Sequence, residues 1–134
     1  MIYNSGHRNL WMQWENNKCG IFDSDAQTFI VPQKYRWILF TDSPDLWWVK
    51  KKNRWGLLRL INNDDFMVSL TYDWVKHTKL YNMFIVKEGK KWGIYNTAMA
   101  SLVSRLEYDH VQCTDDPMVF ITRIGDKKDL LKIE

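Results

Sequence analysis

The sequence predicts an all-β fold made of three to four tandem antiparallel β-meander repeats of about 36–37 residues each. Two short patterns recur on this period, and no stretch shows the 3.6-residue apolar stripe of an amphipathic helix. A chain of 134 residues is the size of one domain, so we expect residues 1–134 to form a single domain.

The first recurring pattern is a glycine that follows a large apolar residue or a cysteine. It occurs as Cys19-Gly20, Trp55-Gly56 and Trp92-Gly93, with the glycines 36 and 37 residues apart. A glycine inside a strand lets a neighbouring backbone or ring approach closely. We therefore expect Trp55 and Trp92 to fill the layer between repeats, with Cys19 as a departure in the first copy.

The second pattern is a strand marked by tyrosine, at Tyr35, Tyr72 and Tyr108, and its spacings are 37 and 36 residues. An apolar run that precedes the glycine turn recurs as well, at 46–50 and 83–87. These markers divide the chain into repeats at about 10–45, 46–82 and 83–117, followed by a truncated copy at 118–134. In that last copy Lys128-Asp129 replaces the Trp-Gly pair, as expected of an atypical end unit.

Within each copy the elements follow one order. The run 83–87 leads into a turn at 88–91 that contains Gly89, and a second strand follows, which predicts a hairpin. In the preceding copy Asn53 can take the positive φ of the turn. A polar connector, a third strand and the Tyr-marked strand come next, and only Thr97–Ser104 is ambiguous between strand and short helix. Three to four such units are too few to close a ring, so we expect an open arc or partial β-propeller.

Charges alternate along the repeat. The hairpin turns are rich in lysine, whereas the connectors are acidic. The acidic connector residues that we single out are Asp42, Asp45, Asp64, Asp65, Asp115 and Asp116. Lysine-rich turns protect sheet edges from aggregation as readily as they bind a ligand. A row of carboxylates would engage a cationic cleft on a partner.

The repeat does not require all of the remaining tryptophans, which are Trp11, Trp14, Trp47 and Trp48. Trp47 and Trp48 are adjacent on a predicted strand, so their side chains point to opposite faces. Both are buried only if both faces are covered. Otherwise one of them is an exposed anchor of the kind favoured at interfaces.

The sequence carries no recognisable catalytic or metal-binding pattern. His7, His77 and His110 have no partner at a useful spacing, and Cys19 and Cys113 form no metal-ligand motif, so we expect reduced thiols. We predict a protein that is not an enzyme and needs no metal or cofactor. Without an apolar run of 18 residues or a signal peptide, we expect no membrane span and a cytoplasmic location.

The segments Arg54-Trp55-Gly56 and Lys91-Trp92-Gly93 resemble the signature of the WG-repeat family of bacterial β-repeat proteins. The downstream pairs Tyr72-Asp73 and Tyr108-Asp109 also fit that family, and the resemblance covers roughly residues 10–133. It implies an all-β repeat array with a binding role rather than catalysis. Small members of this kind look like immunity proteins, which bind and block a cognate toxin.

Our leading hypothesis is therefore an immunity protein that forms a 1:1 complex with a toxin domain. A nuclease toxin, such as an RNase of a contact-dependent growth inhibition system, has a basic cleft that the six aspartates could cover. The first alternative is nucleic-acid binding through basic hairpin tips and aromatic residues. A phage-type anti-defence inhibitor and a glycan binder are further alternatives. The net charge of +3 is small for a duplex-DNA binder, so nucleic acid is the less favoured partner.

Overall fold

The computed structural model describes residues 2–4, 7–60 and 65–133, and this part of the chain is all-β. The strands form four small antiparallel sheets, and no helix occurs among the described residues. The chain divides into two compact units, unit 1 (Met1–Thr71) and unit 2 (Tyr72–Glu134). The single domain expected from the sequence remains a prediction, and each unit is described by itself.

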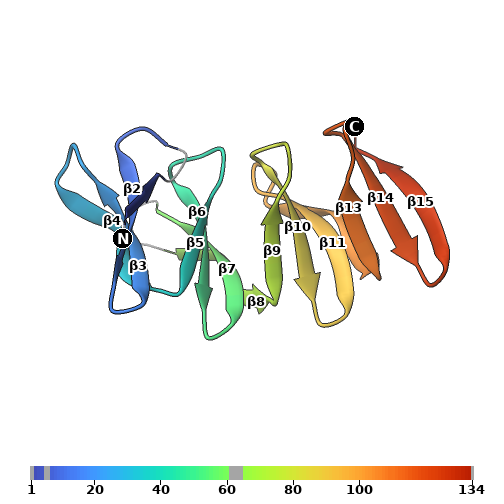
Figure 1. Cartoon of the computed structure of the whole chain (residues 1–134), viewed down its shortest axis with the longest axis horizontal. Helices are drawn as coiled ribbons and strands as arrows, with labels where there is room; N and C mark the ends of the chain where they lie inside the picture. The colour runs from blue at the N-terminus through green and yellow to red at the C-terminus, as the bar shows by residue number, and fades with distance from the viewer. Residues whose placement is uncertain (1, 5–6, 61–64, 134) are drawn as a thin grey trace. The chain divides into compact units, whose positions relative to one another are not determined.

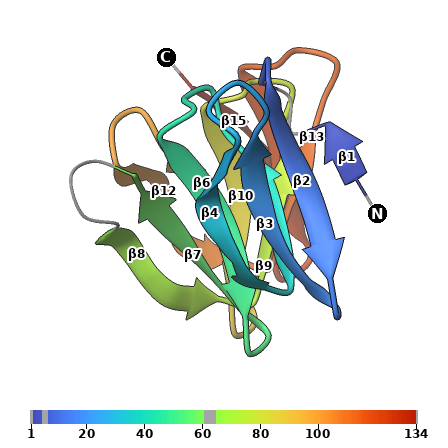
Figure 2. The same ribbon diagram turned by 90° about the vertical axis from the view of Figure 1, so that its left-hand side faces the viewer.

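Unit 1 contains two four-stranded sheets in which the strands are neighbours in chain order (Figure 1). The first consists of β1 (Ile2–Asn4), β2 (Leu10–Glu15), β3 (Lys18–Asp23) and β4 (Thr28–Tyr35). The second consists of β5 (Trp37–Phe40), β6 (Leu46–Lys51), β7 (Arg54–Arg59) and β8 (Asp65–Tyr72). Figure 2 faces the first sheet and shows β3 lying between β2 and β4.

Unit 2 contains one four-stranded sheet and one three-stranded sheet. The four-stranded sheet consists of β9 (Trp74–His77), β10 (Met83–Glu88), β11 (Lys91–Asn96) and β12 (Ser101–Tyr108). The three-stranded sheet consists of β13 (His110–Cys113), β14 (Val119–Ile124) and β15 (Lys127–Lys132). Thr97–Ala100 is a turn and β12 follows it, so the ambiguous segment is not a helix.

The predicted hairpins are present. β10 and β11 pair from Glu88↔Lys91 outward around Gly89, whose φ is 61°. In the equivalent turn between β6 and β7, Lys52 and Asn53 take φ values of 53° and 63°. The fourth strands β4, β8 and β12 end at Tyr35, Tyr72 and Tyr108, and the next sheet begins two residues later. The limits of the sheets therefore differ from the predicted repeat limits at 10–45, 46–82 and 83–117.

The glycines that mark the repeat lie under the fourth strand of their sheets. A Cβ atom on Gly20 would stand 2.3 Å from the Val31 carbonyl oxygen, and one on Gly56 would stand 2.7 Å from that of Val68. The pairing of β3 with β4 is shifted at the same place, which is the mark of a β-bulge. The glycine is needed because the bulged strand crosses directly over it, as the sequence predicts.

Each unit has its own apolar core. In unit 1 both sheets contribute, with Ile21 and Val31 from the first sheet and Trp47 and Val49 from the second. In unit 2 the core joins Ile85 and Ile94 to Val111 and Phe120. Tyr35, Tyr72 and Trp55 are buried as expected, whereas Trp92 and Tyr108 are only partly buried.

Candidate functional site

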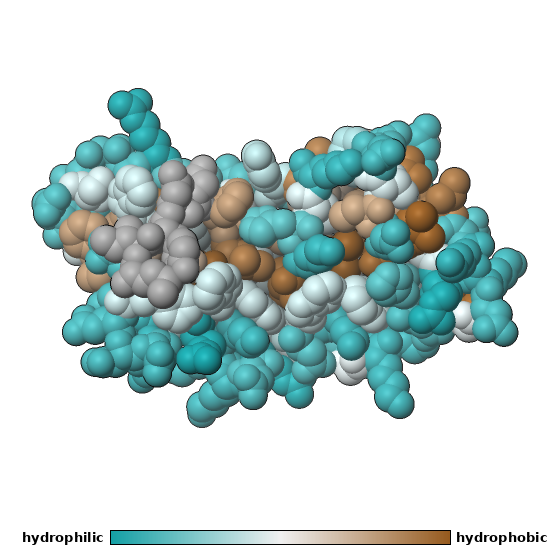
Figure 3. All heavy atoms as spheres, viewed as in Figure 1, coloured by the Kyte–Doolittle hydropathy of each residue, from teal (hydrophilic) through white to brown (hydrophobic). Residues whose placement is uncertain are grey.

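The strand order places hairpins and connectors at opposite ends of every sheet. The hairpins β2–β3, β6–β7, β10–β11 and β14–β15 lie at one end, and the longer connectors lie at the other (Figure 1). In Figure 3, within each unit taken by itself, the region of these hairpins is covered mainly by hydrophilic residues. Within each unit we call these the hairpin end and the connector end.

The connector end of unit 1 is acidic. Asp42 and Asp45 are exposed on the β5–β6 connector, and Asp65 is exposed at the start of β8. Asp23 and Asp25 lie on the β3–β4 connector of the neighbouring sheet. The cations at this end, on the described residues, are Arg8 and Arg59. Asp64, the remaining candidate of this group, lies outside the described residues.

The β5–β6 connector is held firmly. Thr41 is 1% exposed, and its hydroxyl donates to the carbonyls of Ser43 and Leu46 and accepts from the Ser43 amide, at 2.9–3.1 Å. The Thr41 carbonyl lies 2.7 Å from Nε2 of His7 on the β1–β2 connector. The connectors of the two sheets therefore touch, and the acidic residues of unit 1 stand on a shared support.

The acidic residues differ in how far they are neutralised. Asp65 forms a 3.5 Å ion pair with Arg59, and the Asp25 carboxylate accepts from Nδ2 of Asn9 at 2.6 Å. Within the described part of the chain, the carboxylates of Asp42 and Asp45 make no hydrogen bond or ion pair. These two are the charges that a partner would meet first.

The other two acidic candidates belong to unit 2. Asp115 and Asp116 are exposed on the β13–β14 connector, where Lys79 Nζ lies 3.9 Å from the Asp115 carboxylate. The Asp116 carboxylate accepts from the Met118 amide at 2.9 Å. The connector end of unit 2 thus carries mixed charge, unlike that of unit 1.

Trp47 and Trp48 are both fully buried, so the exposed-anchor role considered for one of them is wrong. Trp47 packs in the core of unit 1, and its Nε1 donates to the Pro44 carbonyl at 2.8 Å. Trp48 faces the opposite way on β6 and also has 0% exposure. Both faces of this central strand are covered, which the sequence alone does not show.

Among the described residues the exposed tryptophans are instead Trp11, Trp37 and Trp74, at 37%, 40% and 39% exposure. Trp11 lies on β2, whereas Trp37 and Trp74 each lie at the start of their strand near the hairpin end. Trp37 lies 5.0 Å from Trp14 between ring centroids, and Trp74 lies 5.0 Å from Trp92. Both are followed by an apolar residue and spaced by the repeat period, which marks them as equivalent positions. Alternation places Trp37 on the same face as Tyr35 and Leu39, but it does not show that Tyr35 is buried and Trp37 exposed.

Lysine ammonium groups lie close to two of these tryptophan rings. Lys76 Nζ lies 5.9 Å from the centre of the Trp74 ring, and Lys87 Nζ lies 5.5 Å from that of Trp92. With Asp73, the residues Trp74, Lys87 and Trp92 line a pocket of about 370 Å³. The Asp73 carboxylate accepts from the Gly89 amide at 2.6 Å, which fixes the hairpin beside this pocket.

His77 and His110 pack against aromatic rings, and both cysteines are free thiols. Burial lowers the pKa of His77, whose ring packs 5.1 Å from that of Phe84, and the His110 ring lies 4.9 Å from Trp92. Both cysteines are free thiols, and burial raises the pKa of Cys19 to about 12. No group of three His, Cys, Asp or Glu side chains suited to a metal ion occurs in the described part of the chain. The described segments also contain no helix that is long and apolar enough to cross a membrane.

No family model matches the chain, and no curated protein matches it. Among solved structures, the chain is similar to a plant lectin with two metal-binding sites from Cicer arietinum, at 8% identity and a TM-score of 0.40, over 99% of this chain and 85% of the lectin. It is also similar to the N-terminal domain of Nup159, at 12% identity and a TM-score of 0.48. That match covers 96% of this chain but only 41% of the Nup159 chain.

Proposed function

We propose that this protein is a non-enzymatic binding module whose acidic connector end in unit 1 engages a cationic surface of a partner protein. The observation that carries the proposal is the pair of unneutralised carboxylates, Asp42 and Asp45, on a connector pinned by Thr41. Charges on a rigid support lose little freedom on binding. Carboxylates grouped at one end also steer a positively charged partner during its approach.

The most specific form of the proposal is an immunity protein that neutralises a nuclease toxin in a 1:1 complex. The resemblance of the Trp-Gly pairs and Tyr-Asp pairs to the WG-repeat family supports a binding role. A nuclease cleft is basic because it holds phosphates, so a cluster of aspartates is complementary to it. The net charge of +3 does not oppose this, because the acidic residues of unit 1 are gathered at one end.

Immunity proteins are encoded beside the toxins that they block, so the reading frame next to that of this protein would encode the partner. The test is a binding measurement with the purified, catalytically inactive product of that reading frame. Reversing charge in the double variant Asp42→Lys, Asp45→Lys is expected to weaken binding about tenfold or more and to lower its association rate. The matched control, Lys51→Glu with Lys52→Glu, alters the hairpin end of the same sheet and should leave the affinity unchanged. Equal effects of both pairs, or no complex with the unaltered protein, would reject the proposal.

The second candidate function is binding of single-stranded nucleic acid at the hairpin ends. The specific observation in its favour is the association of exposed Trp74 and half-buried Trp92 with Lys76 and Lys87. Bases stack on aromatic rings, and lysines neutralise the phosphates between them. This candidate predicts binding of an oligouridylate at low salt that weakens steeply as salt rises and is lost in Trp74→Ala. Binding that is indifferent to Trp74→Ala would argue against it.

A further inference from the structure

β15 differs from the equivalent strands because its outer edge is unpaired. In the other three sheets the third strand, β3, β7 or β11, pairs with a fourth strand, which is β4, β8 or β12. Among the described residues, no strand pairs with β15 on the side away from β14. In the three four-stranded sheets, the strand that pairs with this edge is eight residues long. It is antiparallel in the two sheets whose register is described, those of β4 and β12.

The backbone groups that face this edge follow from the register. Ile94 is the fourth residue of β11, and its amide donates to Oγ of Ser104 on the fourth strand at 3.0 Å. Leu130 is the fourth residue of β15, so its amide faces outward in the same way. Instead of a strand partner it has the carboxylate of its own neighbour, because Oδ1 of Asp129 accepts from the Leu130 amide at 2.8 Å.

Asp129 itself stands where the other sheets have glycine. At Gly20, Gly56 and Gly93 the fourth strand crosses so closely that a Cβ would lie 2.3–3.1 Å from a backbone oxygen. Beside Gly20 and Gly93 the pairing of that strand is also shifted, as in a β-bulge. A strand with the same bulge would collide with Asp129. The strand that pairs with β15 must therefore be unbulged at this position and must offer a group to the carboxylate.

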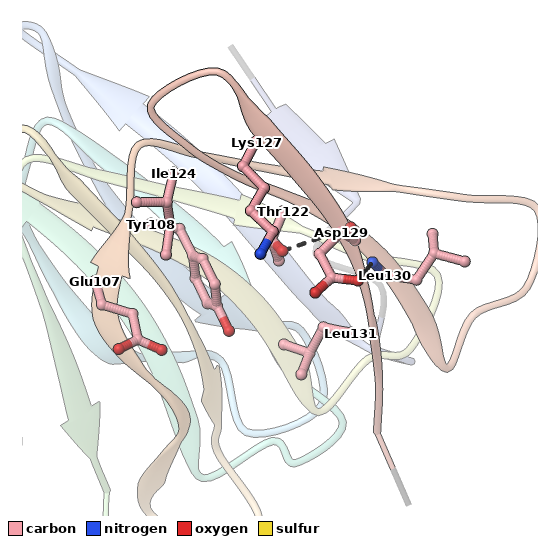
Figure 4. Close-up of a pocket in the computed structure, with 8 residues that line it drawn as sticks. All are labelled: Glu107, Tyr108, Thr122, Ile124, Lys127, Asp129, Leu130 and Leu131. Carbon is pink, nitrogen blue, oxygen red and sulfur yellow. Dashed lines mark hydrogen bonds between the residues drawn. The ribbon is translucent and has the colours of Figure 1, made fainter.

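The space beside Asp129 is a pocket of about 290 Å³. It is lined by Glu107, Tyr108, Thr122, Ile124, Lys127, Asp129, Leu130 and Leu131 (Figure 4). In Figure 4 Glu107 and Tyr108 lie on one side and Asp129 and Leu131 on the other. Burial, followed by the interactions with Glu107 and the charge of Asp129, raises the pKa of Tyr108. The ionisable side chains that line the pocket beside this tyrosine are the carboxylates of Glu107 and Asp129 and the ammonium group of Lys127. Ile124 and Leu130, at 52% and 67% exposure, provide apolar surface beside it.

We propose that the outer edge of β15 binds an extended segment of a partner protein as a fourth antiparallel strand, with an arginine or lysine of that segment placed between Asp129 and Glu107. The incoming cation draws the Asp129 carboxylate away from the Leu130 amide. That amide then donates to a carbonyl of the segment, as in β-strand addition. On the opposite face Lys128 and Lys132 favour acidic residues of the segment, because alternate side chains of a strand point to opposite faces.

The charges also explain why this edge is selective. A long apolar edge would pair with any exposed strand, and charged side chains along it prevent this. Three lysines and Asp129 on β15 exclude segments that do not match their alternation. The inference concerns unit 2 alone and does not rest on the function proposed for the acidic end of unit 1.

The experiment uses the full chain and a synthetic eight-residue peptide of valine and threonine. It carries arginine at the position facing Asp129 and glutamate at the positions facing Lys128 and Lys132. One control peptide has the same composition, with glutamate at the position facing Asp129 and arginine at the position facing Lys128. A second control has N-methylated amides on the pairing edge. We expect both controls to bind about tenfold more weakly or worse, and we expect the arginine peptide to slow amide exchange at Leu130.

The variant Asp129→Asn should abolish the preference for arginine over a glutamine peptide while leaving the thermal unfolding of the protein unchanged within error. The Asp42→Lys, Asp45→Lys variant should bind the arginine peptide normally, so this result is independent of the function proposed above. Equal binding of the arginine and N-methylated peptides would overturn the proposal. A dimer in sedimentation without peptide, with the Leu130 amide protected, would also overturn it, because the occupant would then be a second copy of this chain.

Discussion

At the scale of the residue, the glycine that follows Trp or Cys has a steric role that differs in strength between sheets. At Gly20 a Cβ would lie 2.3 Å from the Val31 carbonyl and 2.8 Å from the Gln33 amide, both of which are backbone atoms. At Gly93 the nearest atom is the Arg105 carbonyl at 3.1 Å. A backbone that must move costs more than a contact that tightens by a few tenths of an ångström.

We therefore predict that Gly20→Ala lowers the free energy of unfolding by about 3 kcal/mol and Gly93→Ala by about 1 kcal/mol. Urea unfolding followed by tryptophan fluorescence measures both. Asp129→Ala, at the position that already carries a Cβ, is the control and should cause no steric loss. Equal destabilisation by the two glycine variants would mean that the bulge relaxes more easily than its geometry indicates.

Asp109 is a residue whose ionisation contributes to stability. Its carboxylate accepts from the Gly125 amide at 2.7 Å and from Lys91 Nζ at 3.0 Å, and these contacts, the backbone bond first, lower its pKa below 3.8. A carboxyl group with a lowered folded-state pKa adds stability above its unfolded pKa, and this is lost as the pH falls through the folded value.

Asp109→Asn should therefore be less stable than the unaltered protein near neutral pH, and the gap should narrow as the pH falls through 3.8 and then below it. Urea midpoints across this range provide the measurement. Asp126→Asn, at the exposed tip of the same hairpin, is the matched control and should leave the pH dependence unchanged. A gap that stays constant with pH would show that the hydrogen-bond geometry, and not the charge, is what Asp109 contributes.

At the scale of the element, the first connector of three sheets has the same internal support. Thr41, Thr78 and Thr114 each donate to two carbonyls of their connector and accept from an amide two residues on. These threonines are spaced by 37 and 36 residues, the period of the glycines and tyrosines. Each connector is therefore shaped by one hydroxyl, and the acidic residues of the β5–β6 connector depend on it.

We predict that Thr41→Val destabilises the protein by about 1–3 kcal/mol, because it leaves buried carbonyl and amide groups without their partner. Thr41→Ser retains the hydroxyl and should recover most of that loss. Thermal unfolding compares the two variants directly. If serine and valine are equally destabilising, the methyl group rather than the hydroxyl of Thr41 is what the connector requires.

The strands and connectors also show which features of the fold can be predicted from the sequence. The hairpins, the close approach at the glycines and the succession of three or four antiparallel strands in each sheet follow from local patterns, and the structure confirms them. The burial of Trp48 does not follow, because alternation says which face a side chain takes but not what covers that face. The acidic residues were predicted as one row, but Lys79 beside Asp115 comes from a different connector, and spacing does not show this contact. The threonines recur in the sequence on the same period, but the hydrogen bonds of their hydroxyls become visible only in the structure.

At the scale of the whole molecule, the two compact units each contain a core of their own. The buried cluster around Ile21 and Trp47 lies entirely in unit 1, and the cluster around Ile85 and Phe120 lies entirely in unit 2. Segments with separate cores open as separate cooperative units when local unfolding is measured. A destabilising change in one unit should therefore act mainly on that unit.

Amide hydrogen exchange of Gly20→Ala tests this expectation at the level of the full chain. Exchange should accelerate throughout residues 7–60, because the new Cβ displaces the β4 backbone that closes the first sheet. In residues 74–133 the rates should stay close to those of the unaltered protein, since the core cluster there is made of residues of unit 2 alone. Thr114→Val provides the reciprocal case and should accelerate exchange mainly in unit 2. Equal acceleration in both units by either variant would show that the 134 residues unfold as one cooperative domain, as the length of the chain alone suggests.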